Sequence, residues 1–167
     1  EPNDVDVGIP ADDFCRQQAF YNLVIEANEN DHLFVGGINL FKSSTQGVSW
    51  EQISHWYGGY ERQNVHPDQH TIVFRPGEGN ENQVVFGNDG GIYYCDNIQN
   101  PYTAIQISER NKGYNTAQFY CGSIDINHST QQDVIAGGTQ DNGTWTKTNA
   151  NDGINTFLYT LGGDGAY

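Results

Sequence analysis

Basic residues are scarce in this sequence of 167 residues. Its 7 lysines and arginines face 21 aspartates and glutamates, which gives a formal net charge of -14 at pH 7. Nucleic acid and anionic membrane surfaces would be repelled by such a charge. We therefore expect no nucleic-acid partner. Cations are better candidates, although an acidic surface also serves solubility alone.

Long apolar runs and methionine are missing as well. No stretch of about 18 apolar residues occurs, so we expect no membrane span. The chain begins "EPNDVDVG", without methionine and without a basic and then apolar leader, which is typical of a mature, processed or excised segment. Its length suits one domain or a piece of one, because a domain has roughly 100 to 200 residues.

Cysteine is rare, and its spacing excludes several chemistries. Cys15, Cys95 and Cys121 form no CxxC pair, which argues against a zinc knuckle. Three cysteines cannot all pair with one another, so in a secreted protein one thiol would stay free or pair outside this segment. The sequence also has no G-x-S-x-G elbow and no phosphate-binding loop, which leaves nucleophilic catalysis with little support.

Glycine and aromatic residues, in contrast, are plentiful. The chain has 20 glycines and 13% aromatic residues, a mixture that suits short strands joined by tight turns, and we predict an all-β fold. Three segments, beginning at Phe20, Gln69 and Phe119, share an order: an apolar strand, a polar turn, a second strand, a glycine pair and a third strand. The corresponding residues are Tyr21, His70 and Tyr120.

A repeat of about fifty residues predicts a particular architecture. Each segment has room for a fourth strand, as in "SWEQIS" and "TAIQIS", and four antiparallel strands per unit of 40 to 50 residues is the plan of a β-propeller blade. We predict three blades at about 20–64, 65–115 and 116–167. Residues 1–19 are either a leader or a closing segment, and the opening residues also fit an amphipathic helix. Three blades make an incomplete ring, so we expect the remaining blades from a longer chain or from other copies.

Two sets of motifs resemble known families. In "FKSSTQGVSW", Ser43, Thr45, Gly47, Ser49 and Trp50 resemble the Asp-box of sialidase, sortilin and xyloglucanase propellers, with Thr45 in place of the aspartate. The segments "LFVGGINLFKSSTQGVSWEQISHWYGG", "VHPDQHTIVFRPG", "VVFGNDGGIY" and "IAGGTQDNGTW" resemble, in this order, the secreted BNR-repeat propellers of Bacteroidetes. This resemblance implies an extracellular or cell-surface location, and it leaves the activity open.

The strand order of a blade decides which loops lie at the same end. The connection His55–His70, "HWYGGYERQNVHPDQH", is expected to share its end with the glycine-flanked turns that hold Asp89, Gln140 and Asp141. Such turns also form for structural reasons alone, because Asn, Asp and Gly are what tight turns require.

Metal binding is one interpretation of this end. In an extended chain His66, Asp68 and His70 alternate onto one side, and two imidazoles with a carboxylate suit zinc or a similar ion. The acidic glycine turns are candidate calcium ligands. No other cofactor is indicated.

Glycoside hydrolysis is a second interpretation. Asp89 in "GNDGGIY" is similar to the catalytic aspartate in the DxGGxY motif of xyloglucanase propellers, and Asp141 or Asp164 is a candidate for the second carboxylate that hydrolysis requires. Scattered arginines argue against a sialidase.

Ligand binding without chemistry needs the fewest assumptions. Aromatic rings beside amide and carboxylate groups suit sugar stacking or the gripping of a peptide. We favour a secreted or cell-surface module that binds a glycan or a surface protein, as in adhesion, over a glycoside hydrolase. The candidate ligand-binding residues are His55, Trp56, Tyr57, Tyr60, His66, Asp68, His70, Asn88 and Gln140.

Overall fold

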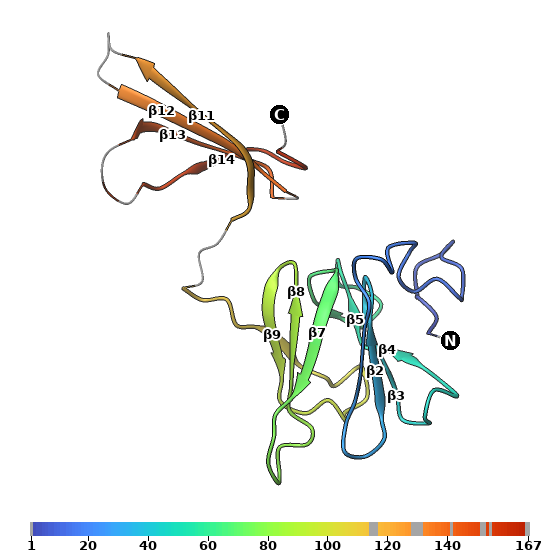
Figure 1. Cartoon of the computed structure of the whole chain (residues 1–167). Coiled ribbons are helices and arrows are strands. Elements are labelled where there is room, and N and C mark those ends of the chain that lie inside the picture. Colours follow the sequence, from blue (N-terminus) through green and yellow to red (C-terminus); the bar gives the residue numbers. More distant parts are fainter. Residues whose placement is uncertain are drawn as a thin grey trace. The chain divides into compact units, whose positions relative to one another are not determined.

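The computed structural model describes residues 2–113, 117–127, 132–140, 142–150, 153 and 155–165. Within these ranges the chain is built from strands, turns and bends and contains no helix, so no helix there is long and apolar enough to span a bilayer. The all-β prediction is confirmed. The chain divides into two compact units, Glu1–Gly113 (unit 1) and Tyr114–Tyr167 (unit 2), which are described separately (Figure 1).

Unit 1 contains two antiparallel sheets of four strands, each running up and down in chain order. The first sheet comprises β1 (Val24–Ala27), β2 (Leu33–Gly36), β3 (Leu40–Ser43) and β4 (Glu51–Gln52). The second comprises β7 (Gln69–Phe74), β8 (Val84–Asn88), β9 (Gly91–Cys95) and β10 (Ile107–Glu109). The connection between them holds a short parallel pair, β5 (Ser54–His55) and β6 (Gln63–Asn64).

Unit 2 contains one sheet of the same plan. Its strands are β11 (Phe119–Asn127), β12 (Gln132–Thr139), β13 (Thr144–Ala150) and β14 (Leu158–Leu161). All neighbouring strands are antiparallel. The predicted four-stranded antiparallel sheets are therefore confirmed, whereas none of the described sheets closes on itself and their assembly into a propeller stays a prediction.

The core of unit 1 lies between its two sheets. Alternate residues of a strand point to the same face, and those of the inner faces are apolar. Phe34 and Leu40 of the first sheet pack with Ile72, Val84 and Phe86 of the second in a single buried cluster. Strands β1 and β7, the first of each sheet, also contact each other. The apolar alternation thus holds the two sheets face to face.

The segment before β1 is a series of turns. The backbone amides of Tyr21 and Asn22 both donate to the Gln18 carbonyl, so the chain turns tightly here. The expected strand start near Phe20 is therefore wrong by a few residues, because β1 begins at Val24, and the alternative of an amphipathic helix is also wrong. Phe14 of this segment packs edge-on against Phe41, with ring centroids 5.7 Å apart.

The turn between β3 and β4 has the polar contacts expected of a box-like turn. The Ser43 hydroxyl accepts hydrogen bonds from the amides of Thr45 and Gly47, at 3.2 and 2.9 Å. The Thr45 hydroxyl accepts the Ser49 amide at 2.8 Å. Gly47 has a φ of 87°, which favours glycine, and the Trp50 side chain lies beside it. Side-chain hydroxyls therefore replace backbone partners across this loop.

Candidate functional site

One end of unit 1 gathers most of the predicted site residues. We call it the turn end. It comprises the β2–β3 turn (37–39), the β8–β9 turn (89–90), the connection 53–68 and the preceding segment 14–22 (Figure 1). The Gln69 amide donates to the Gly37 carbonyl at 2.9 Å, and the His66 ring packs on Gly90 so closely that a Cβ there would overlap it. The connection between the sheets is thus bound to both turns.

Asp89, His70 and Tyr21 form a cluster at the turn end. His70 Nε2 lies 2.6 Å from Asp89 Oδ1, and the Tyr21 hydroxyl donates to both Asp89 oxygens, at 3.0 and 2.9 Å. The Tyr21 and His70 rings meet edge to face with centroids 5.0 Å apart. All three residues are exposed. The structure therefore brings two predicted residues together with Tyr21, which the sequence signalled only as the repeat equivalent of His70.

A bulge in β7 presents His70. Gln69 pairs with Asn88 and Thr71 with Gly87, so His70 is the extra residue between two pairs. A bulge bends a strand and redirects a side chain, and here the His70 ring reaches the β8–β9 turn. The equivalent residue of unit 2, Tyr120, lies at the same kind of irregularity, between Phe119 and Cys121.

The structure does not bring the predicted metal ligands His66, Asp68 and His70 together as a group that could hold an ion. The prediction assumed an extended chain, but Asp68 has a φ of 63°, in the left-handed region. The Asp68 carboxylate accepts a hydrogen bond from Asn22, the His66 ring packs on Gly90, and His70 bonds Asp89. Across the described ranges, no group of three or more His, Cys, Asp or Glu side chains is arranged to hold an ion. The described residues therefore provide no set of ligands for the predicted calcium ion.

The other predicted residues have surroundings of their own. Asn88 is buried, where its Oδ1 accepts the Gly90 amide at 3.0 Å and its amide faces Gln69, so it shapes the turn. Gln140 and Asp164 belong to unit 2, and Asp141 lies outside the described residues. Asp164 lines an open cleft of about 530 Å³ with Cys121, Gly138 and Leu161. No second carboxylate is therefore established beside Asp89.

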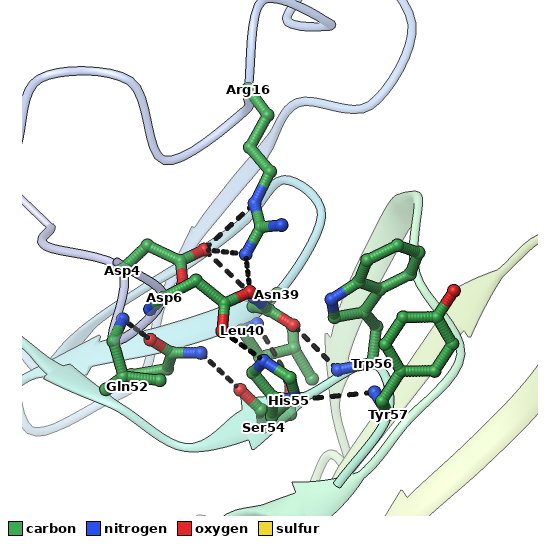
Figure 2. Close-up of polar contacts among 11 residues, drawn as sticks. Asp4, Asp6, Arg16, Asn39, Leu40, Gln52, Ser54, His55, Trp56 and Tyr57 are labelled. Atoms are coloured by element: carbon green, nitrogen blue, oxygen red, sulfur yellow. Dashed lines mark hydrogen bonds and ion pairs between the residues drawn. The ribbon is translucent and has the colours of Figure 1, made fainter. Parts of the chain in front are cut away.

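The aromatic loop, residues 55–60, presents a second group of predicted residues. The Trp56 and Tyr57 rings lie side by side, with centroids 3.9 Å apart and planes tilted by 34° (Figure 2). Tyr57 is 76% exposed, and Tyr60 is also exposed. The Arg16 guanidinium lies 5.6 Å from the Trp56 ring centroid (Figure 2).

A polar network anchors this loop from beneath. Arg16 donates to Asp4 at 2.8 Å and to Asp6 at 2.6 Å, and Asp6 also faces His55 Nε2 at 3.0 Å (Figure 2). His55 is buried, and its Nδ1 accepts the Tyr57 amide at 3.3 Å, so Nε2 carries the hydrogen and donates to Asp6. His55, predicted as a ligand-binding residue, thus serves as a bridge to the opening segment.

The same segment also reaches Trp56. Buried Asp4 accepts the Asn39 amide at 3.0 Å, and Asn39 Oδ1 accepts the Trp56 backbone amide at 2.9 Å. Sequence reasoning missed Asp4, Asp6 and Arg16. The only signal for them is the spacing of the two aspartates in "NDVDV", which indicates that their side chains lie on the same side of the chain.

Charge and burial compete at Asp6. Burial by itself would raise the pKa of Asp6, but hydrogen bonds from Arg16 and His55, together with electrostatic attraction, outweigh it and leave the pKa lowered. Burial likewise would lower the pKa of Arg16, but its bonds to Asp4 and Asp6 leave that pKa raised. Both shifts favour the ionised pair, as expected when opposite charges lie within about 4 to 6 Å.

No family model, no curated protein and no solved structure matches this chain. Fold and site geometry therefore define its class: an all-β protein of four-stranded antiparallel sheets with an exposed aromatic and carboxylate surface at one end of unit 1.

Proposed function

We propose that this chain is part of a secreted or cell-surface β-propeller of the BNR type and acts as a recognition module that binds carbohydrate or protein. The repeat of about fifty residues and the four-stranded sheets support the architecture. The turn end of unit 1 is the binding surface, and its aromatic loop supplies the main contact.

The observation that carries the proposal is the exposed Tyr57 ring. Large rings are normally buried because each removes much apolar area from water. Tyr57 instead faces solvent over Trp56, while the network of Asp4, Asp6, Arg16 and His55 holds the base of the loop. A ring fixed in this way loses little entropy when a flat sugar face or a peptide side chain packs on it.

Hydrolysis of a glycoside is the less favoured alternative. Asp89 is exposed as a catalytic carboxylate would be, and its two oxygens accept bonds from Tyr21 and His70. Catalysis, however, needs a second carboxyl group within roughly 5 to 10 Å, and none is established beside Asp89. Binding requires no carboxylate pair.

A glycan and peptide panel tests the proposal on the full chain. The substitution Tyr57→Ala should weaken the affinity for the ligand about fivefold to tenfold, because stacking on the ring contributes about 1 kcal/mol to binding. Val48→Ala removes an exposed apolar side chain from the β3–β4 turn, away from the turn end, and should leave affinity unchanged. Equal binding by the Tyr57→Ala and parent proteins would contradict the proposal. Reducing ends that disappear with Asp89→Ala would instead establish the hydrolase.

A further inference from the structure

The cluster of Tyr21, His70 and Asp89 is centred on the Asp89 carboxylate, which both rings contact. The Tyr21 hydroxyl donates to Asp89, and an ionised carboxylate only accepts, so His70 Nε2 also donates to it. His70 Nδ1 bonds to no described residue. Among the described residues Tyr21 alone donates to Asp89 Oδ2, which leaves this oxygen room for a further donor.

Among the described residues, the Asp89 carboxylate bonds His70 and Tyr21, and neither a lysine nor an arginine lies within pairing distance. The side chain of Asp89 is 23% exposed, so a partner's charged group can reach it. A ligand that only donates, and is positive, fits this arrangement better than a sugar hydroxyl, which brings both a donor and lone pairs.

Elsewhere in unit 1 two arginines of the chain lie over tyrosine rings, and one of these tyrosines also bonds an aspartate. The Tyr94 hydroxyl donates to Asp96 at 2.9 Å, and the Arg110 guanidinium lies 5.2 Å from the Tyr94 ring centroid. Arg62 stacks on Tyr102 at 3.4 Å. Tyrosine with aspartate, and a guanidinium over the ring, is thus a combination that this fold already uses.

We propose that Asp89, Tyr21 and His70 form a subsite for an arginine side chain of a partner protein. The inference rests on the proposed recognition function and narrows its ligand to a protein with an exposed basic residue. Asp89 pairs with the guanidinium, while the Tyr21 and His70 rings lie beside it. The net charge of -14 attracts such a partner over longer distances.

Titration of the ¹⁵N-labelled full chain with the peptide acetyl-Gly-Arg-Gly-amide tests this subsite. At low ionic strength we expect saturable shifts of the Asp89 amide and the His70 ring signals. The matched peptide with citrulline in place of arginine keeps the shape without the charge and should give no saturable shift. Asp89→Asn should weaken arginine binding about fivefold or more, because it removes the charge that pairs with the guanidinium.

The control variant is Asp96→Asn. It removes the same charge from another exposed aspartate bonded to a tyrosine, whose ring already faces Arg110. Affinity should change less than about twofold, since screened surface charges act weakly over distance. Equal weakening by both variants, or no saturation with the parent protein, would overturn the arginine subsite. The arginine subsite would also be overturned if a neutral oligosaccharide shifted the Asp89 amide signal and the peptide did not. That result would still support the recognition function, which the Tyr57→Ala comparison tests separately.

Discussion

At the scale of single residues, Asp6 couples the opening segment to the aromatic loop. Its carboxylate accepts Arg16 and faces His55, whose ring in turn accepts the Tyr57 amide. Removal of one member of such a network leaves the others short of a partner in a partly desolvated place, which costs more than the bond itself. The orientation of an exposed tyrosine thus depends on a residue 51 positions earlier in the sequence.

The pH dependence of stability should reveal this carboxylate. Because the folded-state pKa of Asp6 is lowered, its contribution is complete above the ordinary aspartate value of about 3.9 and is lost as pH falls through the folded-state pKa. Asp6→Asn should therefore lower the free energy of unfolding by about 1 to 2 kcal/mol at pH 7, with a smaller difference below pH about 3. Urea unfolding followed by tryptophan fluorescence at several pH values measures this.

Glu29→Gln serves as the control, because Glu29 is exposed in the β1–β2 turn and the described residues offer it no ion pair. A difference between Asp6→Asn and the parent protein that stays constant with pH would show that Asp6 acts through packing rather than through its charge.

At the scale of elements, the β3–β4 turn joins two strands through side-chain hydroxyls. Ser43 is buried and accepts two backbone amides, whereas the neighbouring Ser44 is exposed and makes no hydrogen bond among the described residues. Ser43→Ala should lower the free energy of unfolding by about 1 to 2 kcal/mol, because two amides lose their acceptor. Ser44→Ala should change it by less than about 0.5 kcal/mol. Similar losses in both variants would mean that these bonds do not stabilise the turn.

The same scale shows what the sequence could predict. Glycine pairs and apolar alternation predicted the four-stranded sheets, and the antiparallel order put His70 and Asp89 at one end. Other features leave no such pattern. Asp68 adopts a left-handed conformation that aspartate tolerates without any flanking signal, and this separated the three expected metal ligands. Arg16 meets Asp4 and Asp6 through turns of the opening segment, where no periodicity fixes which side chains face each other.

At the scale of the whole molecule, the two units differ in how much apolar surface they bury. The buried cluster draws all its members from unit 1, where two sheets cover each other. In the described part of unit 2, a single sheet leaves Ile124, Leu158 and Leu161 exposed. Because local opening is easiest where few apolar contacts must break, each unit should open with its own free energy.

Hydrogen exchange followed by mass spectrometry measures these free energies segment by segment. Amides of β2 and β8, beside buried Phe34 and Phe86, should exchange at least about tenfold more slowly than those of β13 and β14, because a tenfold difference needs only about 1.4 kcal/mol. Ser43→Ala provides the control, since it should speed exchange in unit 1 and leave β13 unchanged. Uniform protection across both units would mean that the sheet of unit 2 gains a covering layer in solution. A dilution series would then tell whether another copy of the chain supplies this layer, because a layer supplied by another copy is lost on dilution.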